Sequence, residues 1–220
     1  MNQSKTHISI LLDRSGSMEA IRDDVVGGYN AFLREQQQLP GEVTWSLTQF
    51  DLEDPREVIH WFLPLAEVPQ LDHATFVPRA GTPFYDALGW NIRTLKGALN
   101  RMPNELRPGK VVVAVFSDGH ENSSRRFSPR RIARMVEERQ GEGWQFTFQG
   151  CDLVGIREAI ACGIPCESTL AYTANAQGTA AAWNSMSQAI SSYRTGLSAD
   201  LTYRDIDESS SPEPFNSLLN

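Results

Sequence analysis

The chain has 220 residues, of which 40% are hydrophobic and 9% aromatic, and it carries a formal net charge of −7. This length and composition are typical of one globular domain with a full core, and they exclude two large domains. The negative charge argues against a nucleic-acid partner. No apolar run is long enough to cross a bilayer, so we expect no membrane partner. The first residues lack the apolar core of a secretory signal, which predicts a cytoplasmic protein.

Three cysteines, Cys151, Cys162 and Cys166, are too few for a disulfide framework, and their odd number fits reduced thiols. Their closeness in the sequence raises the alternative of a zinc site. A fourth ligand is missing and no histidine lies close to them in the sequence. We therefore interpret the three cysteines as buried, inert thiols.

The first half of the chain predicts three strands and one helix. A short apolar run over 7–13 predicts a buried strand that ends at Asp13. Apolar residues at helical spacing then predict a helix that ends near residue 38. Alternating residues over 42–50 predict a second strand, and a third follows over 58–65 after a turn. Because a parallel connection needs a dozen residues or more, the second and third strands must be antiparallel.

The second half begins with a loop rich in turn-forming residues and a helix whose start is marked by Thr82 followed by proline. The most apolar run of the sequence follows that helix and predicts a central strand that ends at Asp118. The remaining segments predict a helix from Ser128, a strand over 144–149, a helix over 152–162, a weak strand over 164–170 and a helix over 176–193.

Helices that alternate with strands predict an α/β fold with a doubly wound, mostly parallel central sheet. The strand over 58–65 would be its antiparallel edge strand, and helices would cover both faces. We assign residues 1–195 to this domain. Residues 196–220 are polar and acidic, which predicts a flexible C-terminal tail.

Oxygen-bearing side chains cluster where the predicted strands end and the next helices begin: Asp13, Ser15, Ser17, Thr82 and Asp118. In a doubly wound sheet the first and central strands are neighbours at the switch point, so Asp13 should lie beside Asp118. Two carboxylates about 4 Å apart repel by roughly 4 kcal/mol at an effective dielectric of about 20, so the pair needs a proton or a cation. A divalent cation with hydroxyl ligands would satisfy both carboxylates and keep one position open. Helix capping is the alternative role of the hydroxyls.

Together these motifs resemble a known site: Asp13-x-Ser15-x-Ser17, Gly81-Thr82-Pro-x-Tyr-Asp-Ala and Val-Phe-Ser-Asp118-Gly. The set is similar to the metal-ion-dependent adhesion site (MIDAS) of von Willebrand factor A (vWA) domains. The resemblance extends from residue 7 to about residue 194. It is greatest to the small stand-alone versions of bacteria and their phages, including those linked to tellurite resistance and stress.

The resemblance implies a Rossmann-like vWA fold and a non-enzymatic, metal-dependent protein-binding module. It implies that Ser15 and Ser17 bind Mg²⁺, or Mn²⁺, directly. Asp13, Thr82 and Asp118 would bind the ion directly or through water. In many vWA domains an acidic side chain of a partner protein fills the last coordination place, so we expect the partner to be another protein.

Several residues are expected on loops at the rim of this site: Arg79, Phe84, His120, Arg125, Arg126 and Arg130. The arginines could guide the carboxylate of a partner toward the ion. The alternative is that they are solvated and paired with Glu121 or other acids.

Two other functions stay open. A metal-dependent phosphohydrolase of related topology commonly has a second carboxylate two residues after its nucleophile, where this chain has Ser15. A nucleotide hydrolase would need the Gly-x-x-x-x-Gly-Lys-Ser/Thr motif, which is absent. A structural subunit with a vestigial metal site is the second alternative.

Overall fold

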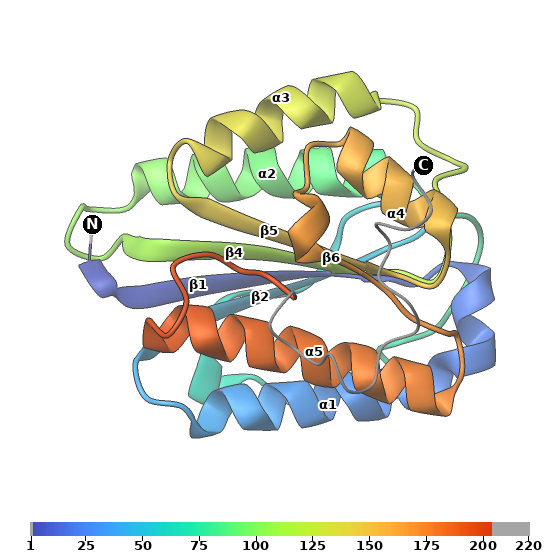
Figure 1. Cartoon of the computed structure of the whole chain (residues 1–220), viewed down its shortest axis with the longest axis horizontal. Helices are drawn as coiled ribbons and strands as arrows, with labels where there is room; N and C mark the ends of the chain where they lie inside the picture. Colours follow the sequence, from blue (N-terminus) through green and yellow to red (C-terminus); the bar gives the residue numbers. More distant parts are fainter. Residues whose placement is uncertain (1, 204–220) are drawn as a thin grey trace.

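The structure is a computed structural model that describes residues 2–203, so the predicted tail from residue 204 onward lies outside the described residues. Six strands form one sheet in the order β3-β2-β1-β4-β5-β6 (Figure 1). They are β1 (Asn2–Asp13), β2 (Glu42–Phe50), β3 (Glu57–Pro64), β4 (Pro108–Phe116), β5 (Trp144–Gly150) and β6 (Thr169–Ala171). Only β3 pairs antiparallel, with β2, as the short connection requires. The predicted α/β fold with an antiparallel edge strand is therefore confirmed.

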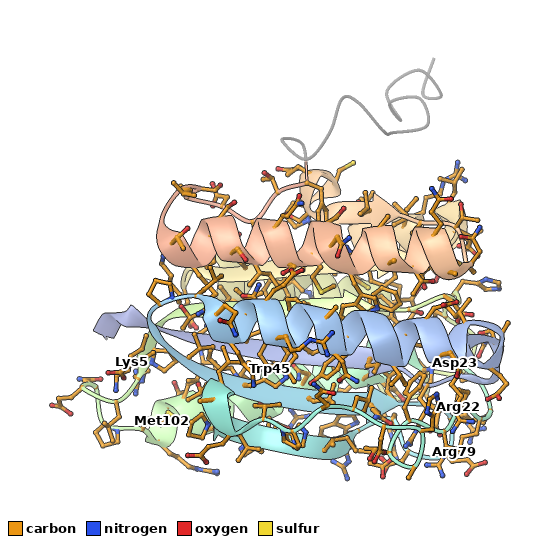
Figure 2. All side chains as sticks on the ribbon, turned by 90° about the horizontal axis from the view of Figure 1, so that it is seen from below. Lys5, Arg22, Asp23, Trp45, Arg79 and Met102 are labelled. Atoms are coloured by element: carbon orange, nitrogen blue, oxygen red, sulfur yellow. The ribbon has the colours of Figure 1, made fainter. Side chains whose placement is uncertain are left out.

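Helices cover both faces of the sheet, as Figure 1 shows. On one face lie α1 (Arg22–Gln38) and α5 (Ala176–Thr195), which run side by side in Figure 2. The other face is covered by α2 (Phe84–Arg101), α3 (Pro129–Gln140) and α4 (Leu153–Ala161). None of the helices in residues 2–203 is long and apolar enough to cross a membrane.

Each face of the sheet buries its own apolar cluster. Under α1 and α5, Trp183 stacks on Phe116 of the central strand with ring centroids 4.3 Å apart. Trp45 is fully buried beside them and donates its indole N–H to the Tyr29 hydroxyl at 3.0 Å. Large buried aromatic side chains of this kind are an effective way to fix helices on a sheet.

Two predicted boundaries are wrong near the C-terminal end of the domain. The last strand, expected over 164–170, is only the three residues of β6, because Ile164 packs in the core and 166–168 form a 3-10 turn. The packed domain also extends beyond residue 195. Leu201 and Tyr203 are buried, and the Tyr203 hydroxyl lies 2.5 Å from the Thr147 hydroxyl. An apolar and an aromatic residue in a polar stretch thus attach 196–203 to the domain.

A bulged edge strand encloses the buried histidine of β1. The register between β2 and β3 shifts twice, and Phe62 takes a φ of 52°. The Phe62 ring stacks on His7 at 3.9 Å, and His7 Nδ1 lies 2.9 Å from the Thr44 hydroxyl. Because burial disfavours the charged imidazole, the pKa of His7 falls to about 3.

This histidine should make stability depend on pH. Below about pH 6.5 the unfolded chain protonates His7 and the folded chain does not, so folding stability is lost as pH falls. His7→Gln removes this proton uptake. The unfolding free energy of the variant should lie below that of the wild type at pH 7. This deficit should shrink by about 2 kcal/mol when the pH is lowered to 5. Urea unfolding at the two pH values measures the difference.

Thr44→Val is the matched control, since it removes the hydroxyl partner but no titrating group. Its deficit should change far less with pH. A deficit of His7→Gln that is equal at both pH values would contradict a buried neutral His7.

Candidate metal centre

The parallel pairing of β1 with β4 brings two aspartates to the same edge of the sheet. Leu12 pairs with Phe116, so Asp13 and Asp118 follow at the carboxyl ends of neighbouring strands. Asp13 has no exposed surface. Its carboxylate accepts hydrogen bonds from the backbone N–H of Ser15 at 2.7 Å and the hydroxyl of Ser117 at 2.5 Å. These bonds hold the carboxylate in one orientation.

The two serines of the first motif face the second aspartate. The hydroxyls of Ser15 and Ser17 lie 3.1 Å apart, and Ser17 donates a hydrogen bond to Asp118 Oδ1 at 2.7 Å. Ser15 precedes the 3-10 helix over Gly16–Ile21, but its side chain makes no capping hydrogen bond. The capping role therefore does not account for Ser15, and its hydroxyl faces the aspartate pair instead.

Thr82 enters the cluster from a third loop. The N-cap of α2 is Pro83, without a side-chain capping bond, so Thr82 is not the cap that the sequence suggested as an alternative. Thr82 is nearly fully buried. A Cβ placed on Gly119 would lie 3.0 Å from Thr82 Oγ1, 3.6 Å from Ser17 Oγ and 3.9 Å from Asp13 Oδ2. These oxygens thus surround one small space, which exists only because residue 119 has no side chain.

The electrostatics of this cluster favour a cation. Burial raises the pKa of Asp13 to about 7, and the nearby charge of Asp118 adds to the effect despite the hydrogen bonds that Asp13 accepts. Burial also raises the pKa of Asp118. The donors are two carboxylates and three hydroxyls, all oxygen, which is the set that hard divalent cations prefer. The residues present therefore fit a Mg²⁺ or Mn²⁺ ion.

The cysteines offer no rival site. Among residues 2–203 no three His, Cys, Asp or Glu side chains form a group that could hold a metal. Cys162 is buried as predicted, whereas Cys151 is half-buried and Cys166 is exposed. The prediction that all three thiols are buried is therefore wrong, because Cys166 lies in the 3-10 turn before β6.

A buried ion-pair network holds the loop of the first motif against the β2–β3 turn. Arg14, between Asp13 and Ser15, is nearly fully buried and contacts Asp51 Oδ2 through Nε at 2.9 Å and Nη2 at 2.7 Å. It also contacts Glu57. Burial alone would raise the pKa of Asp51, but hydrogen bonds from the Asp54 backbone and from Arg79 and Arg14 lower it overall.

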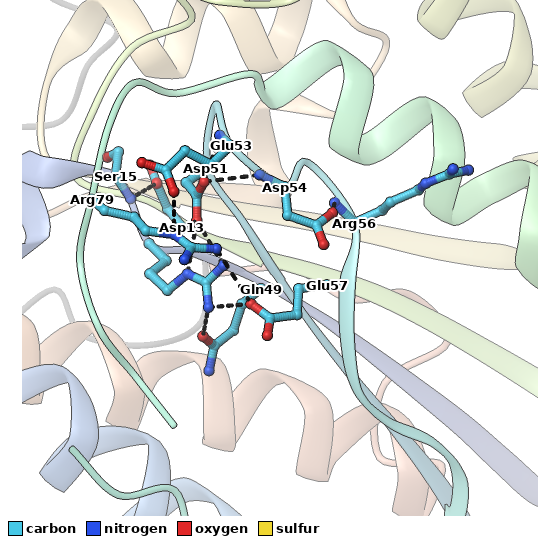
Figure 3. Close-up of polar contacts among 10 residues, drawn as sticks. Asp13, Ser15, Gln49, Asp51, Glu53, Asp54, Arg56, Glu57 and Arg79 are labelled. Atoms are coloured by element: carbon cyan, nitrogen blue, oxygen red, sulfur yellow. Dashed lines mark hydrogen bonds and ion pairs between the residues drawn. The ribbon is translucent and has the colours of Figure 1, made fainter. Parts of the chain in front are cut away.

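The third loop joins the same network. Arg79 Nε donates to Asp51 Oδ2 at 3.0 Å, and Figure 3 shows Arg79 and Asp51 beside Asp13 and Ser15. Backbone hydrogen bonds also join these two loops. Arg79 N donates to Arg14 O at 2.8 Å and Gly16 N to Ala80 O at 2.9 Å. The loop that carries Thr82 is thereby attached to the loop that carries Ser15 and Ser17.

Two of the expected rim residues do not present a free side chain, and Arg79 follows the alternative that the rim arginines pair with acids. Arg79 is paired with Asp51, Glu53 and Glu57, although 39% of its side chain is exposed, and Phe84, the first residue of α2, is buried. Exposed positions are held by His120 and by the three remaining rim arginines: Arg125, Arg126 and Arg130.

Sequence reasoning missed several residues that shape the site: Ser117, Gly119, Arg14 and Asp51. Ser117 and Gly119 flank the central aspartate, so their positions in the Ser-Asp-Gly motif were a usable signal. The contact between Arg14 and Asp51 joins residues far apart in the sequence, and no local pattern predicts such a pair.

Removing Asp51 should be strongly destabilising, because it leaves the Arg14 guanidinium buried without its main partner. We expect Asp51→Ala to cost about 3–5 kcal/mol of unfolding free energy. Glu53→Gln is the matched control, since Glu53 contacts the same Arg79 at 3.5 Å from an exposed position and should cost under about 1 kcal/mol. Chemical denaturation measures both. Equal costs would show that the buried pair does not hold the loop.

Comparisons with known proteins support the fold but assign no family by sequence. No family model matches the chain, and no curated protein matches it. Solved structures do match, among them the pilus adhesin SpaC of Lactobacillus rhamnosus GG, at 14% identity and a TM-score of 0.61 over 87% of this chain and 30% of that one. Another is a mussel byssus protein, proximal thread matrix protein 1, at 15% identity and a TM-score of 0.58 over 86% and 46%.

A third match is a von Willebrand factor type A protein of Catenulispora acidiphila, at 14% identity and a TM-score of 0.57 over 84% of this chain and 42% of that one. The chain thus spans less than half the length of these proteins. One structure of the byssus protein has a zinc-occupied MIDAS motif, and the similar TRAP protein of Plasmodium vivax, with a TM-score of 0.52, is manganese-loaded. The chain has a mostly parallel six-stranded sheet with one antiparallel edge strand, and helices cover both of its faces. Its fold is the Rossmann-like fold of vWA domains.

Proposed function

We propose that this chain is a non-enzymatic protein-binding module whose binding depends on a divalent cation at the oxygen cluster. The observation that carries the proposal is the convergence of donors from three loops around the space beside Gly119. Two buried carboxylates with raised pKa values have no arginine or lysine partner within the described residues. A cation relieves that repulsion, whereas a purely structural role gives no reason to bury both acids.

The ligands follow from the arrangement. Ser15 and Ser17 would hold the ion directly, and Asp13, Thr82 and Asp118 would hold it directly or through water. When bound, the ion supplies two positive charges and at least one coordination place for an outside ligand. The two carboxylates balance its charge, and the three hydroxyls add none. An acidic side chain of a partner protein would then be held by direct coordination to the ion at the remaining place, and it would bring one negative charge to the site.

The solved structures are in keeping with this proposal. One match is a pilus adhesin, and two others hold zinc or manganese. Mg²⁺ is our choice because it suits an all-oxygen site, with Mn²⁺ as the alternative. The proposal includes the stand-alone bacterial or phage type that the motifs resemble, with a role in stress or tellurite resistance and a cytoplasmic place of action.

Metal binding should stabilise the folded chain. Mg²⁺ at about a hundred times its dissociation constant should add roughly 2.7 kcal/mol to the unfolding free energy. Asp118→Ala should remove most of this gain, and so should Gly119→Ala, whose methyl group would lie 3.0 Å from Thr82 Oγ1. Thermal melts in Mg²⁺ and in EDTA measure the gain. Glu35→Gln, an exposed carboxylate on α1, is the control and should keep it. Equal midpoints of the wild type in Mg²⁺ and EDTA would refute the metal site.

Partner binding should depend on the same ion. Tagged protein should capture a partner from lysate in Mg²⁺ and release it in EDTA, and Asp118→Ala should capture none of it. Mass spectrometry identifies the captured protein. Capture that is indifferent to EDTA would point to another binding surface. Hydrolysis of a generic phosphate ester in Mg²⁺ that is lost in Asp13→Asn would instead favour the phosphohydrolase alternative.

A further inference from the structure

Six exposed arginines lie on or near α2, the start of α3 and the loop that leads to it, close to the candidate metal centre. We call this group the arginine surface, and its members are Arg56, Arg93, Arg125, Arg126, Arg130 and Arg131. Because the whole chain carries −7, the rest of the chain carries a formal charge of −13. Among residues 2–203 none of these six side chains forms an ion pair. Positive charge is thus concentrated here without internal partners.

Two aromatic rings orient three of these arginines, Arg56, Arg93 and Arg131. The guanidinium groups of Arg56 and Arg93 lie 4.7 Å and 5.1 Å from the ring centroid of Trp90. Trp90 meets Phe127 edge to face at 5.7 Å, and Arg131 lies over Phe127 at 4.7 Å. Figure 3 shows Arg56 extending away from the Asp51 cluster. Such cation–π contacts orient the planar groups while their N–H donors stay free.

The backbone under the arginine surface is fixed by α2. The carboxylate of Asp86 accepts hydrogen bonds from the backbone N–H groups of Arg125, Arg126 and Phe127 at 2.8–2.9 Å. Phe127 in turn packs over Gly89, where a Cβ would lie 2.6 Å from the ring. The position of the loop is therefore built into the fold and does not depend on a ligand.

The arginine surface begins at the metal centre. Asn122, in the same loop as Arg125, donates its N–H to Thr82 O at 3.1 Å and accepts from Thr82 N at 2.9 Å. Asp86 and Trp90 lie one and two helical turns beyond Thr82 along α2. A segment that places one residue at the metal centre can therefore continue directly onto the arginines.

Helix stability does not explain two of these charges. Arg130 and Arg131 lie in the first turn of α3, which contains no acidic residue, whereas α1 begins with Asp23 and Asp24. The helix dipole disfavours cations at this end. Arginine side chains also favour a ligand with planar, two-oxygen anionic groups, because the guanidinium fork matches a carboxylate.

We propose that the arginine surface binds an acidic segment of the partner whose carboxylate completes the metal centre, so the proposal rests on the proposed function. The partner is a protein segment with several Asp or Glu residues next to the one that reaches the ion. A carboxylate is the group that can bind both to the ion and to the arginines. A nucleic acid offers only phosphates and is the competing outcome of the test.

A fluorescein-labelled deca-glutamate peptide tests the proposal by fluorescence anisotropy. Wild-type protein in Mg²⁺ should bind it, and Arg126→Gln/Arg130→Gln should bind about five- to tenfold more weakly, because two rim charges are lost. Arg34→Gln/Arg101→Gln removes two exposed arginines from elsewhere and should bind within about twofold of the wild type. Melting curves of both variants without metal establish that they are folded.

The outcomes separate the two proposals. Both proposals, the arginine surface and the metal centre, are supported if the Arg126/Arg130 variant binds the peptide more weakly and if EDTA also reduces binding by the wild type. The same arginine dependence with equal binding in EDTA supports the arginine surface and refutes completion of the metal centre. Equal binding by the two double variants overturns the arginine surface. Tighter binding of a labelled thymidine oligonucleotide than of the peptide also overturns it, in favour of a nucleic acid.

Discussion

The structure buries two carboxylates at the ends of neighbouring parallel strands. The electrostatic cost of burying both charges is the constraint on which the surrounding site depends. Parallel pairing gives β1 and β4 the same direction, so both strands deliver their aspartates to one edge. Burial raises the pKa of Asp13 and of Asp118, since neither charge is well solvated. The surrounding hydroxyls are neutral and cannot remove this cost. A cation bound between the acids would offset it.

A positively charged side chain follows Asp13 directly in the sequence, but it does not form an ion pair with Asp13 in the part of the chain that the structure describes. Arg14 follows Asp13 directly, yet within the described residues its ion pairs go to Asp51 and Glu57. Successive side chains of an extended segment point to opposite sides, which separates the two charges. Asp51 also engages Arg79, so the network is acidic enough to hold both arginines. The guanidinium is thereby engaged away from the aspartate pair, which has no positively charged partner among the described residues.

Local patterns predicted the parts of the fold that depend on local chemistry. The apolar run that ends at Asp118 and the short β2–β3 connection fix the strand neighbours, and these bring the site together. The three-residue β6 and the packing of Tyr203 depend on contacts with β5, which periodicity does not reveal. The ion pair of Arg79 likewise depends on a contact that periodicity does not reveal. Its place beside the metal loops was predicted, but its engagement by Asp51 depends on a turn far away in the sequence.

In the proposed function the metal centre and the arginine surface both bind acidic groups of a partner, although the chain as a whole is acidic. Screening resolves this apparent conflict. At physiological ionic strength charges more than about 8 Å apart interact weakly, so a docked acidic segment responds mainly to the charges it touches. For a segment docked as proposed, the nearest positive charges would be the six arginines. The acids Asp86 and Glu121 also lie close, and their carboxylates accept backbone hydrogen bonds from the loop that carries Arg125. Under the proposal, the general negative charge would disfavour unspecific contact with polyanions, while the arginine surface would select acidic segments that can also reach the ion.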